Sequence, residues 1–111
     1  MTITNIKNLP KGRYVTECLY YDSHAWKVIK KTKRTMTVAA VEVERDPEWK
    51  PEIHAGGFAG HCANQHQQTW LFSRVNRDLT TTIRLNKKGQ WVHKGTRFIR
   101  GVAKEFYDYN F

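Results

Sequence analysis

The sequence predicts a mainly β fold, either a small barrel or two packed antiparallel sheets of six to seven short strands. Three observations support this fold class. Runs of aromatic and β-branched residues recur along the chain, apolar side chains alternate within them, and glycine-containing turns separate them. The length of 111 residues is typical of one domain. We therefore expect a single basic β domain over residues 1–111, interrupted by one long Gly/His-rich loop.

The first half of the chain carries three predicted strands. Residues 13–21 read RYVTECLYY and residues 25–31 read AWKVIKK, and both patterns favour half-buried extended backbone. Residues 35–44 form a longer third strand after a basic turn. One face of this strand carries Met36, Val38 and Ala40. The other face, which we expect to point inward, carries Thr37, Ala39, Val41 and Val43. Both faces have apolar stretches, so we expect parts of this strand to be covered on both sides.

Periodicity disappears in the predicted loop, at about residues 45–68, which contains two Pro, three Gly and three His. Loops of this length are uncommon inside a small domain and are often functional. We expect a short helix within residues 63–68, because Ala and Gln favour helix. Trp49 lies between two prolines and is the tryptophan that we expect to be exposed. Trp70 and Trp91 lie within strand patterns and are expected in the core.

The last third of the chain has the clearest alternation. A short strand at 69–72 is followed by residues 79–86, where one face carries Leu79, Thr81, Ile83 and Leu85. The turn at 86–89 ends in a glycine, so residues 79–93 predict a hairpin. Gly95 and Gly101 bracket one more strand, TRFIR. The aromatic tail is expected to pack down through Phe106, Tyr107, Tyr109 and Phe111.

The composition points to a soluble protein of a reducing compartment. The hydrophobic fraction of 40% is adequate for folding. No apolar run approaches the roughly 20 residues that cross a bilayer, and residues 1–9 lack the pattern of a signal peptide. Two cysteines, Cys18 and Cys62, are too few for a disulfide-stapled secreted domain, so we expect reduced thiols. The expectation is a cytoplasmic location, no membrane association and no cofactor.

The long loop holds the only residues that suggest metal or catalytic chemistry, namely His54, His61, Cys62 and His66. Imidazole and thiolate are zinc ligands, but their spacing matches no familiar zinc site. A Cys62 nucleophile with a neighbouring histidine, oriented by Asn64 or Gln65, is the best enzyme hypothesis. The competing interpretation is a small buried side chain. Residues 56–60 could offer backbone N–H groups to phosphate, but they match no nucleotide motif. We expect no metal and no catalytic residue, although enzyme activity stays open.

Charge is the strongest functional signal. Nineteen Lys and Arg against ten Asp and Glu give a formal charge of +9, a field that attracts polyanions but can also serve solubility alone. The basic residues gather around two predicted hairpins, interleaved with tryptophans that could stack a base or could simply be core. The candidate nucleic-acid-binding residues are Lys27, Lys30, Lys31, Lys33, Arg34, Trp49, Lys87, Lys88, Lys94 and Arg97, with Trp26, Trp91 and Arg100 nearby.

Three segments carry a resemblance to a known group of proteins. SHAWKVIKKTKRTMTVAAVE, LTTTIRLNKKGQWVHKGTRFIRG and EFYDYNF resemble parts of small, uncharacterised β-rich proteins encoded in bacteriophage and prophage genomes. The KKGQW turn and the YDYNF tail are the most telling parts, and the GGFAGHCANQ segment departs from the pattern. The resemblance implies a phage-type source and action in the host cytoplasm, but it carries no established activity.

Three classes of function follow from these observations. The first is binding of nucleic acid or another polyanion through the basic hairpins. The alternative is a phage accessory or anti-defence protein that inhibits a host protein or sequesters a nucleotide signal, and an enzyme centred on the loop ranks third. The sequence does not distinguish DNA, RNA, nucleotide and protein partners, and it leaves the oligomeric state open.

Overall fold

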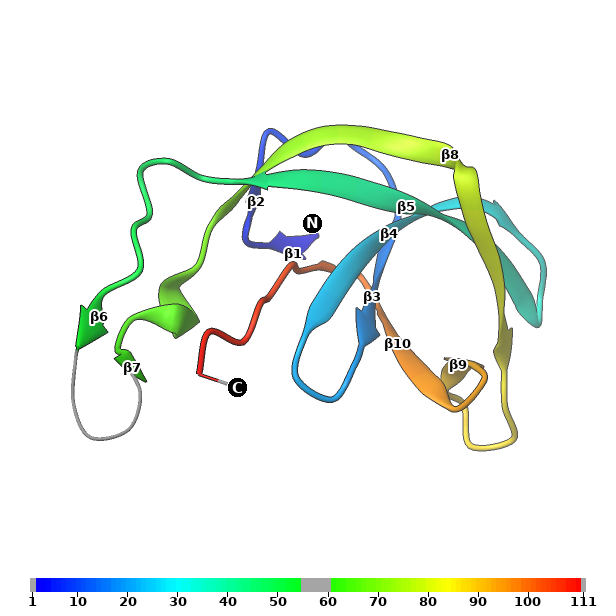
Figure 1. The fold of residues 1–111 in the computed structure, drawn as a ribbon. Coiled ribbons are helices and arrows are strands. Elements are labelled where there is room, and N and C mark those ends of the chain that lie inside the picture. Colours follow the sequence, from blue (N-terminus) through cyan, green and yellow to red (C-terminus); the bar gives the residue numbers. More distant parts are fainter. Residues whose placement is uncertain (1, 55–60, 111) are drawn as a thin grey trace.

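The computed structural model describes residues 2–54 and 61–110 (Figure 1). Its main sheet has seven strands, in the order β2-β8-β5-β4-β3-β10-β9. These strands are β2 (Ile6–Lys7), β3 (Tyr14–Cys18), β4 (Ser23–Lys31), β5 (Thr35–Arg45), β8 (Trp70–Leu85), β9 (Trp91–His93) and β10 (Thr96–Arg100). Neighbours pair antiparallel, except that β2 runs parallel to β8. The prediction of a mainly β fold is confirmed.

The two ends of this strand order meet. β9 pairs with β10 and also with β8, where Arg84 faces Val92 and Leu85 faces Trp91. Figure 1 shows the long β8 bending down to β9 at the right of the molecule. The main sheet therefore curls back on itself rather than dividing into two sheets of similar size.

Two small sheets complete the described structure. β1 (Ile3–Thr4) pairs parallel with β11 (Val102–Ala103). Within the predicted loop, β6 (Ile53–His54) pairs with β7 (His61–Cys62), and the short helix that we expected is a single 3₁₀ turn, η1 (Gln65–Gln67). Within the described residues, no helix is long and apolar enough to cross a membrane.

Strand β5 contributes to two apolar clusters on opposite faces. Met36 and Val38 pack in a cluster with Val15, Ile83, Trp91 and Phe98, whereas Val41 packs with Ile6, Tyr14, Ala25 and Ala103. The change of face coincides with an irregularity in the pairing with β8, where Ala39 faces Thr80 but Ala40 faces Asn76. The unpaired residues lie on β8, so it is the alternation of β8 that shifts. On β5 both faces are covered: Ala39 and Val41 are buried on the face expected to point inward, and Met36 and Val38 are buried on the other face, as the apolar stretches on both faces predicted.

The predicted hairpin in the last third is confirmed. Its turn is closed by a hydrogen bond from Asn86 N to Gln90 O of 2.8 Å, and Gly89 adopts a positive φ of 76°. The TRFIR segment is β10. The two separate strands expected at 69–72 and 79–86 are one continuous strand, β8.

The aromatic tail packs against distant parts of the chain, as expected. Phe106 pairs with Ser23 through two backbone hydrogen bonds, and the ring of Tyr109 lies 5.6 Å from that of Trp49. Tyr107 is exposed beside Tyr109, and Phe111 lies outside the described residues. The tail thus covers the region where the long loop leaves β5.

Candidate nucleic-acid interface

The fold gathers the two basic sequence segments into one surface. Residues 27–41 contain five Lys and Arg and residues 79–104 contain seven, and neither segment contains an Asp or Glu. They lie side by side, because Thr35 pairs with Arg84 and Leu85 N donates to Arg34 O at 2.9 Å. We call this surface the basic end and define it by Lys30, Lys31, Lys33, Arg34, Lys87, Lys88, Lys94, Arg97 and Arg100.

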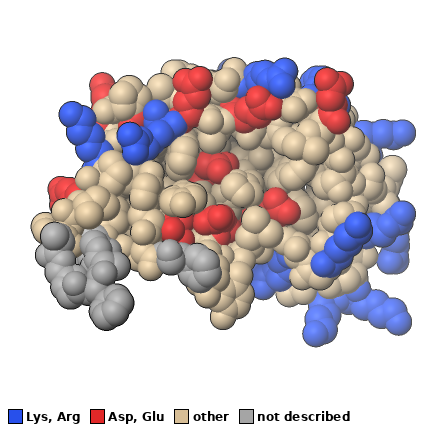
Figure 2. All heavy atoms as spheres, in the orientation of Figure 1, with Lys and Arg blue, Asp and Glu red and all other residues tan. Residues whose placement is uncertain are grey.

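The charge of the basic end is uncompensated. All nine defining residues are exposed, and within the described part of the chain none of them forms an ion pair. Figure 2 shows Lys and Arg at the lower right of the molecule, while Asp and Glu lie in the middle and along the top. Cations of one sign without nearby carboxylates produce a positive potential that extends into solvent.

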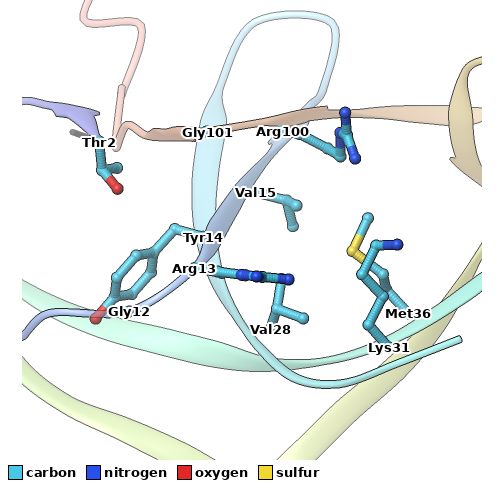
Figure 3. A pocket seen from close by; sticks show the side chains of 10 residues that line it. All are labelled: Thr2, Gly12, Arg13, Tyr14, Val15, Val28, Lys31, Met36, Arg100 and Gly101. Carbon is cyan, nitrogen blue, oxygen red and sulfur yellow. The ribbon is translucent and has the colours of Figure 1, made fainter.

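A cavity of about 580 Å³ opens beside the basic end. Three cationic side chains, Arg13, Lys31 and Arg100, lie around it, and Figure 3 shows them on different sides of Val15. We call it the arginine hollow, and its other lining residues are Thr2, Gly12, Tyr14, Val15, Val28, Met36 and Gly101. No lining residue is acidic, so the hollow combines three cationic side chains with the apolar side chains of Val15, Val28 and Met36.

The order of the strands in the sheet explains why these three cations lie close together. Arg13 directly precedes β3, Lys31 ends β4 and Arg100 ends β10. β3 lies between the other two strands, and its pairs bring the strand ends together. Arg100 faces Val15, and Arg13 O accepts a hydrogen bond from Val28 N at 2.9 Å. The hollow is therefore fixed by backbone pairing rather than by a loop.

A second, shallower cleft of about 470 Å³ adjoins the hollow. It shares Lys31 and Arg100 with the hollow and adds the cations Lys33 and Arg97, over a wall formed by Trp91, Phe98 and others. We call it the Trp91 cleft. The two depressions are therefore neighbours with two cationic lining residues in common.

The expected role of Trp49 at this surface is wrong. Its side chain is only 8% exposed, and it packs against Tyr109. It also follows the far end of β5, roughly 35 Å from the β4–β5 turn if each strand residue advances about 3.3 Å. A turn closed by a hydrogen bond from Trp49 N to Asp46 O directs the indole under the C-terminal tail. Neighbouring sequence does not reveal this tail contact.

The other tryptophans do not form open stacking platforms. Trp91 is buried, as expected, and Lys31 Nζ lies 5.7 Å from its ring centroid. Trp26 is half-buried and donates from Nε1 to Glu17 Oε1 at 3.1 Å. Trp70, expected in the core, is partly buried against the cluster of Val41.

The other predicted residues differ in where the structure places them. Lys31, Lys33 and Arg97 line the depressions, whereas Arg34, Lys87, Lys88 and Lys94 lie exposed on the surrounding turns and Lys30 lies exposed near the end of β4. Lys27 is half-buried over the ring of Tyr14, 5.8 Å from its centroid, and lines neither depression. Sequence reasoning missed Arg13, which we treated only as the start of a strand. A cation directly after Gly12 was the signal that could have identified it.

The structure describes His54, His61, Cys62 and His66, the loop residues that suggested metal or catalytic chemistry. Cys62 is buried, its Sγ lies 3.5 Å from Asn64 Oδ1, and His54 faces His61 across β6 and β7. His66 is exposed and stacks on Phe106. Within residues 2–54 and 61–110, no group of three or more His, Cys, Asp or Glu is placed to hold a metal ion. The segment 56–60, considered for phosphate binding, lies outside the described residues.

Comparison with protein-family models, with curated proteins and with solved structures finds no match to this chain. The resemblance to phage-encoded proteins therefore stays a prediction. The functional argument rests on the geometry and charge of the basic end.

Proposed function

We propose that this protein binds nucleic acid through the basic end. One observation carries the proposal: two acid-free segments with five and seven Lys and Arg lie side by side at one end of the curled sheet. Lys and Arg that neutralise backbone phosphates release condensed counterions, which drives binding with little dependence on sequence. Phosphate contacts alone do not read bases, so we expect weak base preference.

Two cations outside the basic end are already held in ion pairs. The cations outside the basic end include Lys7, held by Asp46 at 2.7 Å and Glu48 at 3.1 Å, and Arg74, held by Glu42 at 2.9 Å. These pairs offer less free charge to a polyanion. The free thiols Cys18 and Cys62 are compatible with the cytoplasmic site of action that is part of the proposal.

The direct test is titration of labelled mixed-sequence oligonucleotides, single and double stranded, at 50 and 200 mM salt. We expect micromolar or tighter binding at low salt and an affinity that falls about 10²-fold or more at high salt. No binding at 50 mM salt, where the net charge acts most strongly, would exclude nucleic acid and favour a host protein as the partner.

Two triple charge-reversal variants of the protein locate the interface. Lys30→Glu, Lys31→Glu and Lys33→Glu together should abolish binding at 50 mM salt. The control carries the same change in net charge at exposed residues outside the basic end and both depressions, in Arg45→Glu, Lys50→Glu and Arg77→Glu. Equal loss in both triple variants would mean that only net charge matters and that the basic end is not the interface.

A further inference from the structure

The arginine hollow has a property that a phosphate-binding surface does not need. Its lining combines the three cations with the apolar side chains of Val28, which is half-buried, and of Val15 and Met36, which are buried beneath it. Its volume of about 580 Å³ falls within the range of small-molecule pockets, about 300 to 1,000 Å³. The apolar part of this lining gains free energy only when a ligand places an apolar group against it.

We propose that the hollow receives one unstacked nucleotide of a single strand. The faces of a nucleobase are apolar and would lie against the half-buried Val28, above the buried Val15 and Met36, while the adjoining phosphates would contact the rim cations Arg13, Lys31 and Arg100. This inference rests on the proposed function and specifies its ligand as single-stranded nucleic acid.

The adjacency of the two depressions supports a strand rather than an isolated nucleotide. Lys31 and Arg100 line both the hollow and the Trp91 cleft, so the next phosphates of a chain held in the hollow would have Lys33 and Arg97 nearby. In a duplex the bases are paired and stacked, and presenting one of them requires unstacking that costs a few kcal/mol. Single strands avoid most of this cost, so they should bind more tightly than duplexes.

The hollow offers few groups that could read a base edge. The Tyr14 hydroxyl donates to Pro10 O at 2.7 Å and is already engaged. The side chains of Val15, Val28 and Met36 carry no hydrogen-bond donor, and the rim cations suit phosphate. We therefore expect the hollow to accept any of the four bases, with differences set by size.

Two double variants with equal loss of charge test the proposal. Arg13→Gln with Arg100→Gln removes rim cations, and Lys87→Gln with Lys88→Gln removes two exposed cations from the β8–β9 turn. All four residues are exposed, so both proteins should fold. The rim variant should bind single strands at least about tenfold more weakly than the turn variant and should lose the preference for single strands over duplexes. Equal effects of the two variants on single-strand binding would overturn the proposal.

A spectroscopic probe tests the position of the base. An oligonucleotide with one 2-aminopurine reports unstacking through a change in fluorescence, which binding to the native protein and to the turn variant should produce. Val28→Phe should abolish that change by filling the hollow, with folding checked by thermal unfolding. Binding without any fluorescence change in the native protein would overturn the proposal.

The same assays distinguish a failure of the proposed function from a failure of the nucleotide site alone. If no oligonucleotide binds at 50 mM salt, the proposed function itself fails. If single strands and duplexes bind equally and the rim and turn variants behave alike, only the nucleotide site fails and a phosphate-binding surface remains. Displacement of the oligonucleotide by micromolar AMP would overturn the strand assignment in favour of a free nucleotide.

Discussion

His24 Nδ1 lies 2.7 Å from Glu105 Oε2 and links β4 to the segment that follows β11. Glu105 is buried, whereas the His24 side chain is partly exposed. The hydrogen bond to Glu105 raises the pKa of His24. Burial opposes this effect, and the charges of Glu105, Glu17 and Asp22 add to it. The protonated imidazole therefore fastens the C-terminal region to the sheet.

This pair predicts a pH-dependent stability. A histidine whose pKa is higher in the folded state binds its proton more tightly there. The stabilisation is complete below the unfolded pKa of about 6.5 and is lost as pH rises through the higher folded pKa. The melting temperature measured from pH 5.5 to 8.5 should therefore contain a decrease that is absent in His24→Gln. The same decrease in His24→Gln would assign it to another group.

Asp46 predicts the opposite dependence in acid. The hydrogen bond from Lys7, with further bonds from Glu48 N and Thr69 Oγ1, lowers the pKa of Asp46 to about 2. Its stabilisation is present above the unfolded pKa and is lost as pH falls from about 4 through the folded value. Asp46→Asn should lower the melting temperature at pH 7 and reduce its fall between pH 4 and 2. An unchanged acid profile would show that other carboxyls dominate.

Ile83 and Leu79 form a matched pair on β8. The alternation assigns both to one face, yet Ile83 is fully buried and Leu79 is 53% exposed beside the irregular pairing with β5. Ile83→Ala should cost about 2 to 5 kcal/mol of unfolding free energy in urea denaturation. Leu79→Ala should cost less than about 0.5 kcal/mol. Similar costs for both would contradict the displaced register.

Asn110 anchors the end of the described chain to the long loop. Its side chain accepts a hydrogen bond from Cys62 N at 2.7 Å and donates to Cys62 O at 3.0 Å. Asn110→Ala leaves both backbone groups without these partners, which should cost about 1 to 3 kcal/mol. In a Cys18→Ser background, thiol labelling of Cys62 should become faster. An unchanged labelling rate would show that the tail does not shield Cys62.

The sequence predicted those elements whose pattern is local. The hairpin at 79–93 and the TRFIR strand follow from alternation and turn glycines alone, and both are present. The third predicted strand is present as β5, but its inward face depends on the register with β8. Residues 77–79 of β8 have no pairing partner on β5. The sequence of β5 itself gives no indication of this shift in register.

The sequence predicted several residues of the candidate site but not the depressions that they line. Lys31, Lys33 and Arg97 were identified from charge, and they do line the depressions. The hollow itself arises where three strand ends meet, so it required the order of the strands and could not be read from spacing. The burial of Trp49 could not be predicted from the neighbouring sequence either, because it depends on Tyr109, a residue distant in sequence.

The parallel pairs β1–β11 and β2–β8 constrain how the nascent chain can fold. Almost the whole chain separates Ile3 from its partner Val102, and most of it separates Ile6 from Trp70. Such non-local pairings slow folding, because the chain loses the entropy of closing a long loop before the contacts form that offset this loss. A ribosome-bound chain that stops before Trp70 could therefore form the β3–β4–β5 meander and the small β6–β7 pair, but neither parallel pair. The first strands would stay unpaired until synthesis delivers their partners.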